Sequence, residues 1–299
     1  MGISLWMMVI LFSAGMLAGT VDAIAGGGGL ISLPLLISIG LPAPVALGTN
    51  KLQASIGTFV ATYNYFRHRL ISFQVIIKGL LFGFLGATSG SLTAQLINSS
   101  LLQKMLPVLM LIIFFYTIYS PKLGLIDSKH RMKESLFFML FGFLLGFYDG
   151  FLGPGTGSFW VIALVFFLGY NLSKATAYTK VFNLKSNIIA TSWFMIGHHI
   201  DYKIGLMMAC GQLLGGKIGS QLVILKGAEL VRPVFLTIVF FTILVMFFKS
   251  YIGFTNLTKF IHLFGMLPIV AVFVVALLFI VKINVWDSRR RDKVSCLVK

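Results

Sequence analysis

Charged residues and cysteines are scarce in this chain. Only 11% of its 299 residues are charged and 58% are hydrophobic, whereas roughly a quarter of the residues in a soluble domain are charged. The two cysteines, Cys210 and Cys296, support neither a disulfide framework nor a metal site. The sequence also lacks an HExxH motif, a CxxC pair and a nucleophile elbow. We therefore expect no catalytic residue, no metal and no cofactor.

Long apolar runs make up most of what is present. Stretches of at least about 18 apolar residues recur along the chain, and each is long enough to cross a bilayer as a helix. The net charge of +16 comes from lysines and arginines gathered in short loops and at the end of the chain. That distribution is typical of cytoplasmic loops that contact anionic membrane lipids, and it argues against nucleic-acid binding. The sequence predicts an all-α, polytopic membrane protein.

The chain contains an internal duplication. GTVDAIAGGGGLISLPLL at 19–36 matches GFYDGFLGPGTGSFWVIA at 146–163, and three further blocks match in the same order. The matched residues of the first two blocks are Asp22 with Asp149, Gly26 with Gly153, Gly28 with Gly155 and Lys51 with Lys180. We predict a first repeat at 1–125, a second at 126–252, an additional helix within 253–285 and a basic tail at 286–299.

Each repeat is expected to hold several helices of unequal length. The predicted segments are 3–24, 30–40, 44–66, 73–97 and 101–120, then 135–151, 157–170, 173–197, 203–225 and 229–249, with an extra helix near 262–284. The short segments at 30–40 and 157–170 leave two membrane topologies open. If each forms one crossing with the segment before it, the repeats are parallel and two basic regions lie on opposite sides of the membrane. If each crosses or re-enters by itself, the repeats are inverted and the basic loops and tail share the cytoplasmic side. We prefer the inverted arrangement because it obeys the positive-inside rule.

The glycine-rich stretches predict two breaks in membrane helices. Their mid-chain repetition argues against a signal-peptide cleavage site, and GGGG lacks the Lys-Ser or Lys-Thr of a nucleotide loop. Backbone freed by glycine survives at membrane depth only inside protein or beside a water-filled cavity. Secondary transporters use such breaks to aim the partly positive ends of half-helices at an anion. The helices after the breaks begin near Leu30 and Ser158, and their N-termini are candidates for an anion site.

Two lysines occupy equivalent places in the long helices. Polar residues follow each at helical spacing: Ser55, Thr58 and Thr62 after Lys51, and Asn183, Asn187 and Thr191 after Lys180. An ionisable residue in a membrane segment is a functional candidate by default, although each lysine alone can also reach a headgroup from a helix end. Asp22 and Asp149 are left with three roles: carrying protons for coupling, pairing with the lysines, or capping the helix breaks.

These motifs together resemble the TauE/SafE family of sulfite and organosulfonate exporters, in its YfcA-like branch. The stretches that carry the resemblance are VDAIAGGGGLISLPLLISIGLP, LGTNKLQASIGTFVATYNYF, GFYDGFLGPGTGS, TKVFNLKSNIIAT and QLLGGKIGSQL, within about residues 5–250. The resemblance implies a carrier in the bacterial inner membrane that exports sulfite, sulfoacetate or a related sulfur anion. It implies substrate contacts at the glycine breaks and at the TNK segment, which the internal repeat extends to the second half. The candidate substrate-binding residues are Gly26, Gly27, Gly28, Thr49, Asn50, Lys51, Gly153, Gly155, Thr156, Thr179, Lys180 and Asn183.

The leading hypothesis is a secondary transporter of small anions, with H+ as the candidate coupling ion at Asp22 and Asp149. The alternatives are a passive anion channel and a carrier of a non-sulfur carboxylate. The expected partners are the anionic substrate and membrane lipids, and the glycine faces of the helices make a homodimer an option. The expected location is the inner (plasma) membrane, multi-pass, with a cytoplasmic C-terminal tail.

Overall fold

The computed structural model describes residues 5–96 and 127–226, which all belong to the first of two compact units, Met1–Gly253. In these ranges the regular structure is entirely α-helical, as expected. The helices are α1 (Leu5–Ala25), α2 (Gly28–Ser38), α3 (Ala43–Arg67), α4 (Phe73–Leu96), α6 (Glu134–Phe151), α7 (Thr156–Leu168), α8 (Leu172–Ile196) and α9 (Tyr202–Lys226). The segments predicted at 101–120, 229–249 and 262–284, and the tail, lie outside the described residues.

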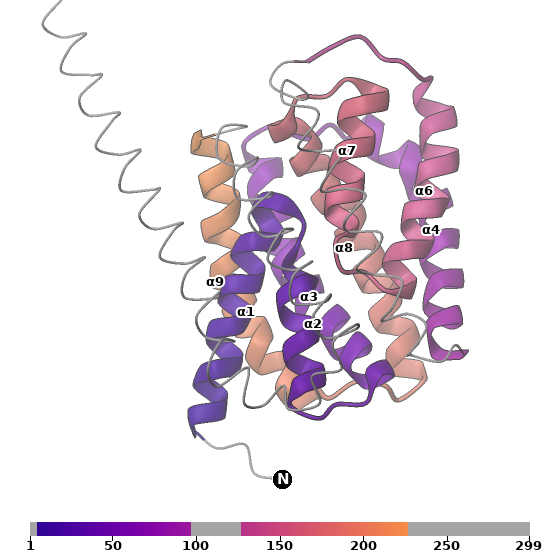
Figure 1. Cartoon of the computed structure of the whole chain (residues 1–299). Helices are drawn as coiled ribbons and strands as arrows, with labels where there is room; N and C mark the ends of the chain where they lie inside the picture. The colour runs from indigo at the N-terminus through magenta and orange to yellow at the C-terminus, as the bar shows by residue number, and fades with distance from the viewer. Residues whose placement is uncertain (1–4, 97–126, 227–299) are drawn as a thin grey trace, which may run out of the picture. The chain divides into compact units, whose positions relative to one another are not determined.

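Two helix hairpins, α1–α2 and α6–α7, recur in the described part of the fold (Figure 1). In the first, Leu11 of α1 and Leu36 of α2 pack in one buried cluster, so α2 returns toward the start of α1. In the second, the backbone N–H of Arg131, just before α6, donates to the carbonyl of Phe167 at the end of α7 over 2.8 Å. Gly26 and Gly153 have positive φ angles of 73° and 85°, a conformation that glycine adopts readily, and they turn the chain at the two tips.

Each hairpin is held by a long helix from the other half of the chain. Figure 1 shows α1 beside α9 and α4 beside α6. Gly211, Gly215 and Gly219 of α9 meet the carbonyls of Phe12, Met16 and Thr20 in step, so α9 and α1 run parallel. Gly86 and Gly90 of α4 meet the carbonyls of Phe143 and Phe147 of α6 in the same way.

These glycine faces serve packing inside the chain. A Cβ at any of the five positions would collide with a carbonyl of the neighbouring helix, so side chains are excluded and the backbones approach closely. The small-residue spacing of α4 and α9 is therefore explained by close packing of helices within the chain. A homodimer remains a prediction, now without these faces to support it.

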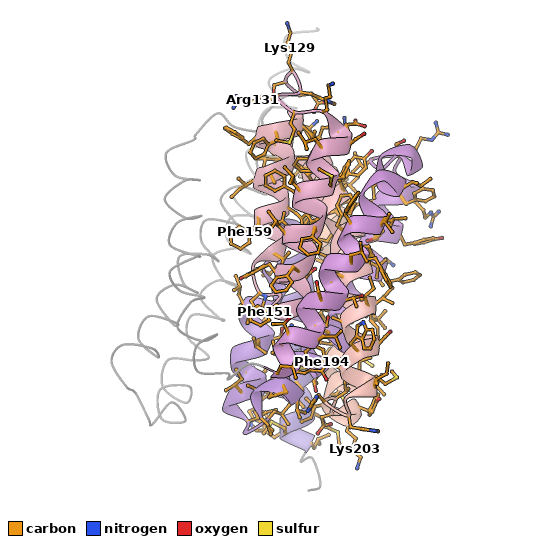
Figure 2. All side chains as sticks on the ribbon, turned by 90° about the vertical axis from the view of Figure 1, so that its right-hand side faces the viewer. Lys129, Arg131, Phe151, Phe159, Phe194 and Lys203 are labelled. Atoms are coloured by element: carbon orange, nitrogen blue, oxygen red, sulfur yellow. The ribbon has the colours of Figure 1, made fainter. Side chains whose placement is uncertain are left out.

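Charge is concentrated at one end of the bundle. Figure 2 shows Lys129 and Arg131 at one end and Lys203 at the other. Helices α3 and α9 run parallel, because Gly57 and Asn64 of α3 contact Gly216 and Ser220 of α9. Since α9 begins beside Lys203, the last residue of α3, Arg67, lies at the opposite end, with Lys129. Between the ends, α1 and α6 are long and apolar enough to cross a membrane by length and composition. Within the described residues the charge distribution agrees with basic loops on one side.

Candidate functional site

The tips of the two hairpins touch each other. A Cβ on Gly26 would overlap the backbone of Gly157, and a Cβ on Gly157 would overlap that of Gly26. Ser158 Oγ donates to the carbonyl of Ala25 over 3.1 Å. Residues 131 and 133 positions apart (157 − 26 and 158 − 25) therefore form one junction, and the glycines of the two breaks permit the contact.

The first charged pair of the junction joins the two halves of the chain. Lys180 Nζ of α8 lies 2.8 Å from Asp22 Oδ2 of α1. The other oxygen of this carboxylate, Oδ1, accepts from the backbone N–H of Gly28 at 3.2 Å, at the start of α2. Asp22 therefore performs two of the three roles that the sequence left open, because it pairs with a lysine and also caps the helix after the break.

The second charged pair is the counterpart of the first. Lys51 Nζ of α3 donates to Asp149 Oδ1 of α6 at 2.6 Å and to Asn187 Oδ1 of α8 at 3.2 Å. A Cβ on Gly153 would lie 2.6 Å from this ammonium, so glycine is needed at the tip of the second hairpin. Asp149 Oδ2 is buried and has no hydrogen-bond partner among the described residues.

Both lysines are deeply buried, at 1% exposure for Lys51 and 0% for Lys180. Side chains that reached a headgroup from a helix end would be exposed at their charged tips. The structure therefore rules out the snorkelling interpretation. Each lysine pairs with the aspartate of the other half, so the four charges predicted from the repeat form two crossed ion pairs.

The remaining candidates of the first half lie in a satisfied hydrogen-bond network. Asn50 Oδ1 accepts from Ser32 Oγ of α2 and from Gln53 Nε2. The other end of the Gln53 amide, Oε1, accepts from Gln212 Nε2 of α9. Thr49 Oγ1 accepts from the backbone N–H of Asp201 over 2.9 Å, which ties α3 to the loop before α9. The position of Thr49 indicates a structural role.

The second-half candidates are less fully paired. Thr179 Oγ1 and Asn183 Oδ1 of α8 are buried and have no hydrogen-bond partner among the described residues. Thr156 Oγ1 donates to the carbonyl of Gly153 and so closes the tip of the second hairpin. Gly27 and Gly155 precede α2 and α7 directly. The half-sites therefore differ: polar side chains beside Lys51 are hydrogen-bonded, whereas Thr179 and Asn183 retain unused capacity.

Sequence reasoning missed two features of this region. Gln212 was not singled out, yet its side chain fills the space left by Gly57 and bonds Gln53. Lys185 was quoted within a motif but not proposed, although its ammonium lies against Gly83 of α4 inside the bundle. The internal repeat could not reveal either residue, because the first half has Gly83 at the position equivalent to Gln212 and Ile56 at the position equivalent to Lys185.

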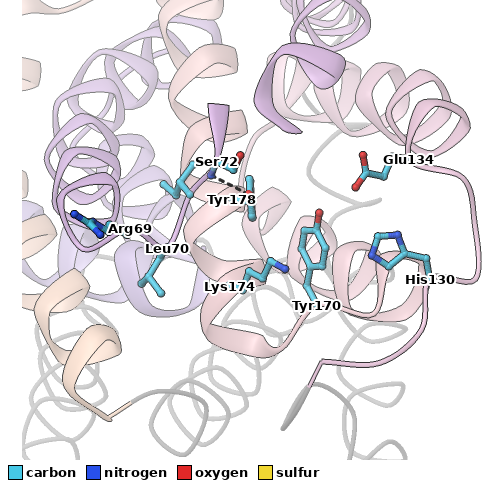
Figure 3. Close-up of a pocket in the computed structure, with 9 residues that line it drawn as sticks. Arg69, Leu70, Ser72, His130, Glu134, Tyr170, Lys174 and Tyr178 are labelled. Carbon is cyan, nitrogen blue, oxygen red and sulfur yellow. Dashed lines mark hydrogen bonds between the residues drawn. The ribbon is translucent and has the colours of Figure 1, made fainter. Parts of the chain in front are cut away.

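A separate pocket opens at the basic end of the bundle (Figure 3). Arg69, His130 and Lys174 line it together with Tyr170 and Tyr178, and the Tyr178 hydroxyl accepts from the backbone N–H of Ser72. Burial, with the Glu134 carboxylate nearby, raises the pKa of the Tyr170 hydroxyl well above its usual value. Tyr170 is therefore a protonated donor at neutral pH. No cluster of three metal-ligating side chains occurs in the described parts of the chain.

Comparison with known proteins places these features in a family. Residues 11–246 match the family described as sulfite exporter TauE/SafE. A probable membrane transporter protein of Haemophilus influenzae is 45% identical over 78% of this chain and 91% of its own length. The probable membrane transporter protein YfcA of Escherichia coli K12 is 42% identical over 75% of this chain and 83% of its own. The probable membrane transporter protein ORF9 of Sinorhizobium is 37% identical over 76% and 87%. No solved structure matches.

Proposed function

The chain belongs to the sulfite exporter TauE/SafE family of membrane transporters, and from this premise we propose that it is a secondary transporter of small anions. The transported anion is sulfite or an organosulfonate, and the direction is outward across the inner membrane. One observation carries the proposal: two buried lysines meet two aspartates and the ends of two broken helices at a single junction.

Inverted repeats are part of this proposal. The direction of the helices supports them: α3 and α1 both run parallel to α9, α4 returns from α3, and α6 runs parallel to α4. The two hairpins therefore enter from opposite ends of the bundle. Secondary transporters with inverted repeats place the substrate between the repeats and expose it to either side by moving one against the other.

The ion pairs suggest how the anion is held. In the described state each lysine is neutralised by an aspartate, so an incoming anion competes with a carboxylate for the ammonium. The start of α7 lies at the same junction and carries the partial positive charge of a helix N-terminus. A substrate with several acceptor oxygens, such as a sulfonate, can accept from a lysine and from backbone or hydroxyl donors together.

Coupling to protons follows from the same exchange. An anion that forms an ion pair with Lys51 or Lys180 leaves Asp149 or Asp22 without its counter-charge. A buried carboxylate without a counter-charge favours its protonated form. We therefore keep H+ as the coupling ion and these two carboxylates as its carriers.

The closed junction favours a carrier over an open channel. The backbones of Gly26 and Gly157 are in contact and both charged pairs are formed, so no water-filled path runs between the tips of the described hairpins. Transport through this junction requires the tips to separate. A protein whose site opens only when its two halves move apart works by alternating access.

A ligand screen tests the proposed substrate class. Purified protein is heated in detergent with sulfite, sulfoacetate, taurine, thiosulfate, sulfate, acetate or succinate, and the melting temperature is compared with that in chloride. Because a ligand that binds only folded protein raises the melting temperature, we expect stabilisation by at least one sulfur anion. Stabilisation by carboxylates alone would replace the sulfur anion by a carboxylate. No shift with any anion would contradict anion transport.

A further inference from the structure

A third lysine, which the repeat does not predict, packs between the described helices α4 and α8. Lys185 lies on α8 at about 20 Å from the start of that helix and about 16 Å from its end, at the usual rise per residue. A lysine side chain is too short to reach either end from there, so its ammonium stays at membrane depth. Its equivalent in the first half is Ile56, which carries no charge.

The surroundings of this lysine provide space but no carboxylate. Its ammonium occupies the place where Gly83 of α4 lacks a side chain, close to the carbonyl of Gly142 in α6. Nζ donates to the carbonyl of Gly79 at 3.3 Å and lies 5.5 Å from the ring centre of Phe182. No carboxylate of the described residues lies within ion-pair distance of Lys185.

Lys185 is electrostatically linked to the crossed ion pairs. Lys185 lies two residues before Asn187, which accepts from Lys51, and the charge of Asp149 acts on its ammonium. Among the described residues, this region contains three lysines and two aspartates, which leaves one positive charge in excess. An uncompensated charge in a low-dielectric interior is costly, so an anion bound in this group would stabilise the charged form of Lys185.

We propose that Lys185 supplies the excess charge that makes the transporter select monoanions. The inference rests on the proposed function and narrows it to substrates with one negative charge, such as hydrogen sulfite or an alkylsulfonate. When such an anion binds Lys51, its charge and those of the two aspartates balance the three lysines, so the group becomes neutral overall.

Binding of two probes of different charge tests the inference. Methanesulfonate is a monoanion and sulfate is a dianion, and both present sulfur-bound oxygens. Affinities are measured by isothermal titration at neutral pH for the wild-type full chain, Lys185→Met, Lys185→Gln and Lys185→Arg. The control is Lys217→Met, which removes an exposed lysine from α9. Melting temperatures without ligand report on folding.

We expect wild-type protein to bind methanesulfonate more tightly than sulfate. Both neutral variants should lose affinity for methanesulfonate by about tenfold or more. Lys185→Arg should retain most of it, and Lys217→Met should match the wild type. If folded Lys185→Met or Lys185→Gln binds methanesulfonate within twofold of the wild type, Lys185 does not set the charge preference. If the wild type binds sulfate as tightly as methanesulfonate, monoanion selectivity is wrong while anion transport stands. If the wild type binds neither probe nor any anion of the screen, the proposed function itself fails.

Discussion

Lys51 and Asp149 are 98 residues apart in the chain, yet the lysine ammonium lies 2.6 Å from the carboxylate. Lys180 and Asp22 are separated by 158 residues and are joined in the same way. Because each pair takes one member from each half, the halves cannot move apart without breaking both. The pairs are therefore structural joints as well as candidate binding groups.

The first prediction concerns the stability of the Lys51–Asp149 pair. Lys51→Met leaves a buried carboxylate without a counter-charge and should destabilise the protein by about 3–5 kcal/mol. Lys51→Met combined with Asp149→Leu removes both charges and should recover most of that loss. Thermal melting of purified protein measures the difference. A double variant no more stable than the single one would contradict a direct pair.

The second prediction uses the other pair with its charges exchanged. Lys180→Asp combined with Asp22→Lys restores an ion pair of opposite polarity, so it should express and melt closer to the wild type than either single change. It should not transport, because a lysine at position 22 cannot accept from the Gly28 N–H and places positive charge at the start of α2. Wild-type transport by this variant would show that the polarity of the pair is unimportant.

The third prediction concerns the contact between the hairpin tips. Gly26→Ala or Gly157→Ala introduces a methyl group into the opposing backbone, and Gly26 also has a positive φ of 73°. Both changes should lower the melting temperature and reduce transport. The matched control is Gly142→Ala on α6, where the nearest atom to the new Cβ is 3.4 Å away. Equal effects at the three positions would argue that the junction has no special importance.

The fourth prediction assigns sides to the membrane. Lys129 and Lys203 are exposed at opposite ends of the bundle (Figure 2). In a chain with Cys210 and Cys296 replaced by serine, Lys203→Cys should react with an impermeant maleimide in intact cells. Lys129→Cys should react only after the membrane is opened. The reverse pattern would place the basic end outside and overturn the positive-inside assignment.

Much of the fold follows from the sequence because its signals are local. Helix lengths, the two glycine breaks and the four repeated charges were recognisable from composition and spacing. The partner of each charge was not, since Asp22 has Lys180 rather than Lys51 as its ion-pair partner, and only the three-dimensional arrangement brings them together. Gln212 and Lys185 were missed for another reason: duplication highlights what the halves share, whereas these residues are where the halves differ.

The most direct test of the central claim is anion flux through the junction in reconstituted vesicles. Wild-type protein and the Lys51→Met/Asp149→Leu double variant are reconstituted at equal density, and efflux of trapped sulfite or methanesulfonate is followed with time. We expect saturable efflux from vesicles with the wild type. A folded double variant should give no more efflux than protein-free vesicles. Efflux at the wild-type rate by that variant would contradict the claim that the crossed lysine–aspartate pairs form the substrate site.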